Sequence, residues 1–297
     1  MAPLTVTVTG ASGFLGAHYL KYTLRNHPEW KLVAQVRSTP LGFSAPNLTC
    51  LTADLTRPMS AQMLASTNPD VIVHMAAAIT EDNARDINTK MMANVLEACK
   101  LSGAKLVYIS SSQVNFSKLN QYAQSKIDDE NAAKASGTPH VSLRPAAPYG
   151  PLLPDHKASR DQSFHALVNF IKKLPAIPVI GDGQYTRQPV HVDDFNHAIN
   201  FFIANDRFEA EAFDIGGPRA IPLDGITDIL CDLIGKKVFK LHLPKQIFIA
   251  STYFVSIFNK DLLQTTDTNE TANNAPLLKV LGKDKFMDFE DGAMTLL

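Results

Sequence analysis

The sequence has few cysteines, no excess of charge of either sign and no long apolar run. Cys50, Cys99 and Cys231 are its only cysteines, and none stands in a Cys-x-x-Cys or Cys/His spacing. We therefore expect neither a disulfide framework nor a metal site, and we interpret each cysteine as a small buried side chain in a reducing compartment. The apolar stretch 247–258 is shorter than the roughly 20 residues that a membrane-spanning helix needs. It predicts a buried helix, with a substrate pocket or a membrane-facing patch as alternatives.

The balance of charge excludes a further class of partner. The chain of 297 residues carries 28 Lys+Arg against 29 Asp+Glu, and no local run of basic residues stands out. Proteins that bind nucleic acid normally use a basic excess to displace counterions, so we expect no nucleic-acid partner. The N-terminus lacks a basic flank followed by an apolar stretch, which favours a cytoplasmic protein. A hydrophobic content of 45% excludes a disordered chain and allows a main domain plus a smaller lobe.

Strand-like and helix-like segments alternate over the first 145 residues. Short runs rich in Val, Ile and Leu indicate buried parallel strands at 4–9, 31–36, 71–75, 106–109 and 141–143. Helical composition separates them at 14–25, 84–101 and 122–135, and Gly103 and Gly137 stand where helix C-caps are expected. This alternation predicts an α/β fold, a Rossmann-type doubly wound parallel sheet with helices on both faces.

The pattern changes after Arg144, where prolines interrupt the periodicity and the polar stretch 152–162 indicates a mobile loop. Residues 190–192 and 212–215 again resemble sheet strands. We therefore predict a cofactor-binding domain made of residues 1–150 with a return segment at 190–216. Residues 151–189 and 217–297 are expected to form a smaller C-terminal α/β lobe that selects the substrate.

A glycine-rich turn joins the first predicted strand to the first predicted helix. Glycines at 10, 13 and 16 allow a tight turn and let the backbone approach a pyrophosphate, while the helix N-terminus offers free N–H groups to an anion. The alternative is an ordinary strand-to-helix turn. Small residues after the strand at 71–75 favour the dinucleotide. So does Asp54, an acid that can bond an adenine amino group. The expected cofactor contacts are Gly10, Ser12, Gly13, Phe14, Leu15, Gly16, Asp54, Leu55, Ala76 and Ala77.

The end of the second strand bears on the form of the cofactor. An acid there binds the free ribose hydroxyls of NAD(H), but the sequence has Arg37 followed by Ser38. Arg37 lies close to the usual spacing of about 20 residues from the last glycine of the turn. A guanidinium suits a 2′-phosphate, so we expect NADP(H) to be preferred, with NAD(H) possible. The alternative is a solvated surface arginine.

A Tyr-x-x-x-Lys pair supplies the candidate chemistry. Tyr122 and Lys126 share one face of the predicted helix, and both are expected to touch the cofactor as well. A nearby ammonium favours phenolate, so the pair predicts a tyrosine whose pKa is lowered from about 10 towards neutral pH. Such a residue donates a proton to a carbonyl or accepts one from an alcohol. Hydroxyl side chains at 110–112 follow the preceding strand and are expected to face the same crevice.

These motifs, in this order, resemble the extended short-chain dehydrogenase/reductase family, in particular its NAD-dependent epimerase/dehydratase branch. The later matching stretches are RPAAPYGP at 144–151 and GDGQYTRQPVHVDD at 181–194. The resemblance implies that Ser111, Tyr122 and Lys126 are catalytic, with Ser112 as the second choice for the serine and Ser110 as the least favoured. It also implies a role for Asn88 near the active site, unless that amide lies on the helix surface.

The same resemblance leaves the substrate open. Arg187 lies in a stretch similar to the segment that binds the diphosphate of nucleotide sugars, and the alternative is a salt bridge with Asp193 or Asp194. Together with Ser112 it is a candidate substrate contact, whereas His74 and His191 are better interpreted as packed histidines. Ala147 stands where many sugar-nucleotide enzymes have Asn, and the short spacing from Ser111 to Tyr122 leaves no room for their longer pocket loop.

We therefore predict an NADPH-preferring oxidoreductase that acts on a small-molecule carbonyl or alcohol, with a homodimer as a possible assembly. A nucleotide-sugar epimerase or dehydratase is the first alternative. A nucleotide-binding structural subunit without catalysis is the second. Turnover separates the first two, because an epimerase keeps its nicotinamide through the cycle whereas a reductase consumes it.

Overall fold

The computed structural model describes residues 3–79, 83–153, 163–247 and 268–297. Most of the stretch expected to be a mobile loop, 152–162, lies outside these residues, and so does nearly all of the apolar stretch 247–258. In the part of the chain that is described, no helix is both long and apolar enough to cross a bilayer.

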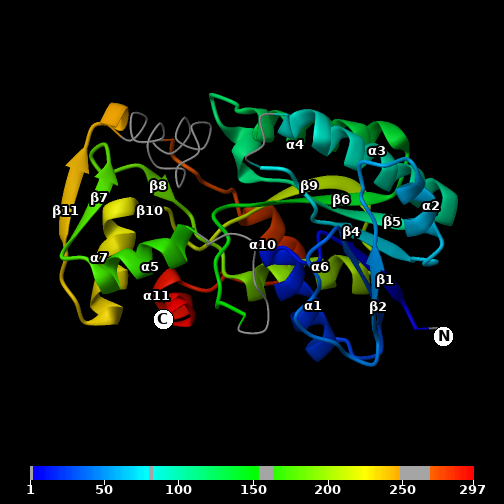
Figure 1. Ribbon diagram of the computed structural model, residues 1–297, viewed down its shortest axis with the longest axis horizontal. Coiled ribbons are helices and arrows are strands. Elements are labelled where there is room, and N and C mark those ends of the chain that lie inside the picture. Colours follow the sequence, from blue (N-terminus) through cyan, green and yellow to red (C-terminus); the bar gives the residue numbers. More distant parts are fainter. Residues whose placement is uncertain (1–2, 80–82, 154–162, 248–267) are drawn as a thin grey trace.

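A seven-stranded parallel sheet forms the centre of the larger unit (Figure 1). Its order is β3-β2-β1-β4-β5-β6-β9, so the strand sequence reverses between β1 and β4. Ligands of open α/β sheets bind at such a reversal, beside the carboxyl ends of the strands. The strands are β1 Thr5–Thr9, β2 Lys31–Val36, β3 Leu48–Thr52, β4 Val71–His74, β5 Lys105–Ile109, β6 His140–Pro145 and β9 Glu209–Ile215.

Helices cover both faces of this sheet, which confirms the predicted Rossmann-type fold. Helices α1 (Phe14–Asn26) and α6 (Val192–Ala204) pack together on one face. Helices α2 (Met59–Ala65), α3 (Ala84–Ser102) and α4 (Gln121–Ser136) pack on the other. Gly103 and Gly137 end α3 and α4 in the left-handed conformation, as their positions in the sequence predict.

A smaller α/β unit lies at one end of the molecule (Figure 1) and has its own apolar cluster. Two short sheets build it, the parallel pair β7 (Ala176–Ile180) and β11 (Phe239–Leu243) and the antiparallel pair β8 (Thr186–Arg187) and β10 (Ile221–Pro222). Among the described residues, the helical segments of this smaller unit are α5 Ser163–Lys173, α7 Leu223–Ile234, α11 Phe289–Gly292 and the 3-10 turn Ala293–Leu296. Helix α10, Ala275–Leu281, instead packs against β9 of the large sheet.

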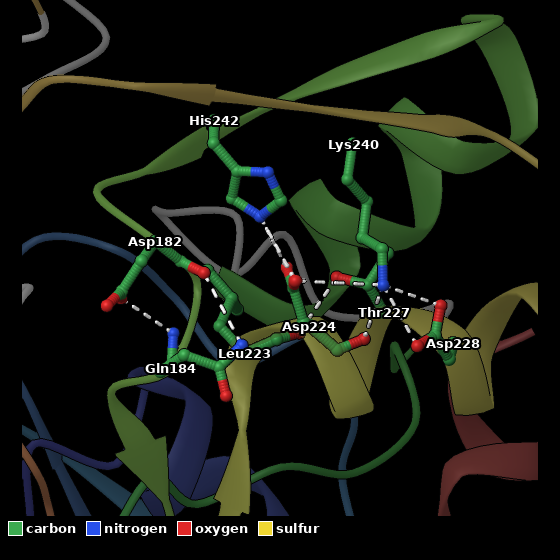
Figure 2. Close-up of polar contacts among 8 residues, drawn as sticks. All are labelled: Asp182, Gln184, Leu223, Asp224, Thr227, Asp228, Lys240 and His242. Carbon is green, nitrogen blue, oxygen red and sulfur yellow. Dashed lines mark hydrogen bonds and ion pairs between the residues drawn. The ribbon is translucent and has the colours of Figure 1, made fainter.

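An ion-pair network ties the smaller unit together (Figure 2). The Asp224 carboxylate on α7 meets His242 Nε2 at 3.0 Å, and Lys240 Nζ donates to Asp228 at 2.8 Å, so α7 is joined to β11. The Asp224 amide also donates to the Gly183 carbonyl in the turn before β8. A side chain at Gly183 would lie 2.3 Å from Asp224 Oδ1, and φ there is +72°. The positive φ and the crowding by Asp224 therefore favour glycine in this turn.

Two expectations about the fold are wrong. Residues 190–192 form only an isolated bridge between Tyr149 and His191, because His191 caps α6 and the helix begins at Val192. Cys50 is exposed, since it lies on the edge strand β3, whereas Cys99 and Cys231 are buried. Within the described ranges, no group of three or more His, Cys, Asp or Glu side chains is arranged to hold a metal ion.

Candidate active site

The turn between β1 and α1 packs so closely against neighbouring backbone that Gly10 and Gly16 have no room for a side chain. A side chain at Gly10, where φ is +65°, would lie 2.7 Å from the backbone of Ala76, and one at Gly16 would lie 2.4 Å from the Gly10 carbonyl oxygen. Helix α1 has no side-chain cap and no acid in its first turn. Its N-terminal amides are therefore suited to an anion, so this cradle fits the pyrophosphate of a dinucleotide. Ser12 and Gly13 lie in the same turn, and Phe14 and Leu15 begin α1, as the sequence predicts.

Gln35 anchors this turn, and the sequence analysis did not identify it. Its side-chain oxygen accepts a hydrogen bond of 3.0 Å from the Gly10 amide, and its amide nitrogen donates to the Ala53 carbonyl at 2.6 Å. Its backbone carbonyl accepts from the Ala11 amide. Gln35 is a buried amide in an otherwise apolar strand, and that is the signal by which it could have been found.

The expected adenine-side residues lie at the carboxyl ends of β2 and β3. Arg37 is exposed directly after β2. The Asp54 carboxylate already accepts from the backbone and side chain of Thr56, and these bonds lower its pKa, with smaller contributions from Arg57 and Arg37. The side chain of Leu55 packs into the core beneath α2 and α3, so this residue offers only its backbone to a ligand. Arg37 and Asp54 are therefore neighbours at the edge of the expected cofactor site.

Asn88 connects the two halves of the site. Its side chain exchanges two hydrogen bonds with the backbone of Ala78, at 2.7 and 2.9 Å, and donates to Ser125 Oγ at 2.8 Å. This amide is buried rather than on the helix surface. It holds the segment that contains Ala76 and Ala77 against α4.

Ser111, Tyr122 and Lys126 come together at the end of β5 and the first turns of α4. The Ser111 hydroxyl accepts a hydrogen bond of 3.2 Å from the Gln113 amide and is close enough to Tyr122 to lower its pKa. Lys126 Nζ donates to the Ile109 carbonyl at 2.7 Å and lies 5.5 Å from the centroid of the Tyr122 ring. Ser110 and Ser112 are buried beside Ser111. The structure thus gathers into one site the residues to which the sequence analysis assigned catalysis.

The pKa of Tyr122 differs from the expectation. Burial raises it to about 12, the neighbouring Ser111 hydroxyl lowers it, and the charges of Glu270 and Asp129 raise it further. Lys126 is not among the groups that lower this pKa, because its own pKa of about 8 means that it has lost its charge before Tyr122 titrates. At neutral pH Tyr122 is consequently a phenol that carries its proton.

A buried carboxylate lies near Lys126. Burial lowers the pKa of Lys126 to about 8, and the charge of Asp129 on the next turn of α4 raises it. Asp129 is buried and accepts a hydrogen bond of 2.8 Å from the Tyr108 hydroxyl, while burial raises its own pKa to about 6. Asp129 therefore favours the charged form of Lys126.

The two histidines are packed side chains, as expected. His74 bonds Thr9 and stacks on Tyr108, and burial lowers its pKa to about 3. His191 accepts from the Asp193 amide as the cap of α6.

The two substrate-side candidates, Arg187 and Ser112, both contact Glu270, a residue that the sequence did not single out. Arg187 forms its ion pair with Glu270, at 3.5 Å from Nε to Oε2, rather than with Asp193 or Asp194. The same carboxylate accepts a hydrogen bond of 2.6 Å from Ser112 Oγ. Glu270 lies 158 positions after Ser112 in the chain, so no local pattern could have paired them.

The fold and the site define a Rossmann-type α/β protein with a glycine cradle at the switch point of its sheet and a Ser, Tyr and Lys cluster at the end of the neighbouring strand β5. The model of the NAD dependent epimerase/dehydratase family matches residues 6–216. The chain belongs to this family.

Solved structures with this fold cover almost the whole chain. The chain is similar to a dTDP-glucose 4,6-dehydratase from Bacillus anthracis solved in complex with NAD, with a TM-score of 0.80, 20% identity and coverage of 99% of this chain and 95% of that one. It is also similar to a UDP-glucose 4-epimerase from Thermotoga maritima, with a TM-score of 0.79, 18% identity and coverage of 99% and 97%.

Curated relatives include several kinds of enzyme. A trifunctional UDP-glucose 4,6-dehydratase, epimerase and reductase of Arabidopsis thaliana is 22% identical over 79% of this chain and 40% of its own length. A ceramide reductase of Caulobacter vibrioides is 27% identical over 64% of this chain and 57% of its own. An uncharacterized UDP-glucose epimerase of Bacillus subtilis is 25% identical over 82% and 86%. The chain therefore spans about half the length or less of the first two.

Proposed function

We propose that this chain moves a hydride between NAD(P) and a substrate carbon that carries a hydroxyl or keto group, with Ser111, Tyr122 and Lys126 as its catalytic residues. One observation supports this most strongly: Tyr122 lies over the buried Lys126, whose Nζ donates to the end of β5 directly before the serines, at the same edge of the sheet as the glycine cradle. On this proposal residues 1–150 and 190–216 hold the cofactor. Residues 151–189 and 217–297 select the substrate.

Each residue has a separate part in the proposed mechanism. Tyr122 Oη holds its proton at neutral pH and donates it to the substrate oxygen during reduction. In the direction of oxidation, the phenolate left after this proton is lost to solvent accepts the proton of the substrate hydroxyl. Ser111 Oγ donates a hydrogen bond to the same oxygen and stabilises the developing negative charge. Lys126 supplies a positive charge beneath Tyr122, with Asp129 favouring that charge. The nicotinamide, when bound, supplies or accepts the hydride.

The relatives bear on the substrate class. Most of those with named reactions act on nucleotide sugars, which favours an epimerase or dehydratase over a stand-alone reductase. The reductase reading is supported by the similarity to a ceramide reductase, a match over 194 residues. We propose the epimerase or dehydratase reading first and the reductase second.

Cofactor stoichiometry tests the two readings. Purified protein is incubated with UDP-sugars, free sugars and hydroxyketones, once with catalytic NAD⁺ and once with excess NADPH. An epimerase or dehydratase gives many product molecules per cofactor with no net change in absorbance at 340 nm, whereas a reductase oxidises one NADPH per product. Cofactor binding without turnover of any substrate would contradict the proposed function and favour a structural subunit.

Arg37 is the residue on which a preference for NADP(H) depends. The Arg37→Ala variant should bind NADPH about tenfold more weakly, because it loses a charged contact to the 2′-phosphate, and should bind NADH as before. Nicotinamide fluorescence titration measures both constants. Arg57→Ala is the matched control, since Arg57 also lies beside Asp54 on the surface. Equal losses for NADPH and NADH, or no loss for either, would exclude this role for Arg37.

A further inference from the structure

Strand β11 turns its polar side chains towards the protein and its apolar side chains away from it. Lys240 and His242 form ion pairs with two carboxylates of α7, so both side chains lie on the face of β11 that packs against this helix (Figure 2). Successive side chains of a strand point to opposite faces. Phe239, Leu241 and Leu243 therefore lie on the face that is directed away from α7.

Strand β7 shows the same two faces. Ile177 and Val179, which are paired with the two polar residues of β11, are buried. Ala176 and Pro178 are paired with the first two apolar residues of β11, and Pro178 is exposed. The side of this sheet that is directed away from α7 is therefore apolar along both strands, and we call it the outer face. The outer face consists of Ala176, Pro178, Phe239 and Leu241.

The outer face is open to solvent. Phe239 is 69% exposed and Leu241 is 45% exposed, and the two strands lie at one end of the molecule (Figure 1). A half-buried strand normally directs its polar residues to solvent, and a shift of one residue in register would reverse the two faces of β11. The ion pairs of Lys240 and His242 with α7 stabilise the register that exposes the apolar side chains. Contiguous exposed apolar surface of this kind is typical of a docking site.

Two pairs of lysines lie at the end of the outer face where both strands begin. Lys172 and Lys173 end α5 just before β7, and Lys236 and Lys237 lie just before β11. Lys236 Nζ donates to the Lys172 carbonyl at 3.0 Å, so the two pairs are neighbours in space. Lys172 Nζ donates to the Leu297 carbonyl at 2.9 Å, whereas Lys173 and Lys237 are exposed.

The positive charge at this end of the molecule is local. Residues 163–181 contain two lysines and residues 233–247 contain four, and neither stretch contains Asp or Glu, whereas the whole chain has a formal net charge of −1. Asp224 and Asp228 lie on the inner side of the sheet, in the ion pairs with β11. Asp232 is exposed on the last turn of the same helix. The outer face is therefore bordered by lysines, and the acids belong to the helix on its other side.

A lipid bilayer matches this combination better than another protein does. Interfaces between proteins are depleted in lysine. At the surface of a bilayer, lysines keep their ammonium groups at the level of the lipid phosphates while neighbouring apolar side chains enter the acyl boundary. Anionic lipids attract such lysines, and a point charge on a flexible stem needs no fixed geometry for this attraction.

We propose that the outer face is a peripheral docking surface for a bilayer that contains anionic lipids, with Phe239 and Leu241 entering the acyl boundary and Lys173 and Lys237 facing the lipid phosphates. This contact holds the chain at the bilayer surface and requires no segment that crosses it. The outer face belongs to the smaller unit and shares no residue with the proposed catalytic site, so the two proposals can fail independently.

Co-sedimentation with vesicles tests the docking surface. The full chain is mixed with vesicles of phosphatidylcholine alone, or of equal parts phosphatidylcholine and phosphatidylglycerol. Wild type should bind the mixed vesicles at least about tenfold more tightly than the neutral ones, because several lysines face the anionic surface. An increase of NaCl from about 0.1 M to about 0.5 M should release most of the bound protein, since salt screens this attraction.

A first pair of variants tests the apolar contribution. Phe239→Ser combined with Leu241→Ser should weaken binding to the mixed vesicles at least about tenfold, because two apolar side chains no longer enter the acyl boundary. Met59→Ser combined with Leu101→Ser is the matched control. Met59 and Leu101 are 67% and 52% exposed, but they lie on α2 and α3 of the larger unit, and this variant should bind as wild type does.

A second pair of variants tests the charge. Lys173→Gln combined with Lys237→Gln should weaken binding to the mixed vesicles about tenfold and leave binding to the neutral vesicles unchanged. Lys90→Gln combined with Lys134→Gln removes the same charge from exposed positions on α3 and α4, and it should bind as wild type does. Circular dichroism establishes that every variant is folded.

Fluorescence provides a second measurement that does not depend on removing side chains. In Phe239→Trp the emission should shift to shorter wavelength when mixed vesicles are added, whereas Leu101→Trp should show no shift. The single native tryptophan, Trp30, is buried in the larger unit and gives a constant background.

Three results would overturn the proposal. The first is a wild-type protein that does not bind mixed vesicles, or binds neutral ones equally well. The second is a loss in the control variants equal to that in the variants of the outer face. The third is self-association of wild type, measured by analytical ultracentrifugation, that Phe239→Ser with Leu241→Ser abolishes, because the outer face then docks a second copy of the chain.

Discussion

Replacing Tyr122 with phenylalanine should lower the turnover number by about 10²–10⁴-fold, the contribution that a positioned acid or base commonly makes. The substitution removes Oη, the proposed proton donor, and keeps the ring that packs over Lys126. The dissociation constants of NADH and NADPH should stay as in wild type. Initial rates with the substrate found by the stoichiometry experiment measure the first effect, and nicotinamide fluorescence measures the second.

Tyr22→Phe on α1 is the matched control for this substitution, because the Tyr22 ring contacts Arg25 on the helix surface and lies outside the site. It should retain wild-type turnover. A Tyr122→Phe enzyme with undiminished turnover would remove Tyr122 from the mechanism. Loss of cofactor binding together with turnover would instead show that the phenylalanine disturbs the cradle.

Gly10→Ala should abolish cofactor binding, with an increase in the dissociation constant of at least about 100-fold, and lower the free energy of unfolding by about 1–3 kcal/mol. The added Cβ would lie 2.7 Å from the backbone of Ala76, and φ at this position is +65°. The added Cβ and the Ala76 backbone atoms are both fixed by the main chain, so no rotation of a side chain can relieve this contact. The turn must open, which displaces the amides that are expected to meet the pyrophosphate.

Gly103→Ala separates the steric effect from the conformational one. Gly103 also has positive φ, at +76°, but a side chain there meets nothing within 4 Å. Its variant should lose only about 1 kcal/mol of stability and bind the cofactor normally. Thermal unfolding and fluorescence titration compare the two. If Gly10→Ala resembled Gly103→Ala in both measurements, the close approach of Ala76 would have no role in cofactor binding.

Local patterns predicted the sheet and its helices well because each depends on neighbouring residues. The runs at β2, β4 and β5 are apolar and β-branched, and the glycines after α3 and α4 end these helices in the left-handed conformation that favours glycine. The same reasoning failed at residues 190–192. Val190 and Val192 flank His191, which caps α6 by accepting a hydrogen bond from the Asp193 amide, so the helix begins where a strand was expected.

Electrostatic properties were harder to predict, because they depend on burial and on distant charges. A Tyr-x-x-x-Lys spacing suggests a tyrosine with a lowered pKa, yet burial dominates and Tyr122 remains protonated at neutral pH. Asp129 lies only three positions after Lys126, but its importance comes from its burial and from its bond to Tyr108, which lies on another element.

The sequence by itself determined the Rossmann-type order of elements, the glycine cradle and the spacing of Tyr122 and Lys126, since helix periodicity and turn stereochemistry act over a few residues. The tertiary structure alone decided what surrounds these groups. Gln35 reaches the glycine turn from a neighbouring strand, and Glu270 reaches Ser112 and Arg187 from the far end of the chain. Contacts of that kind depend on how the strands and the two units pack, and it is there that the chemistry of the substrate side is set.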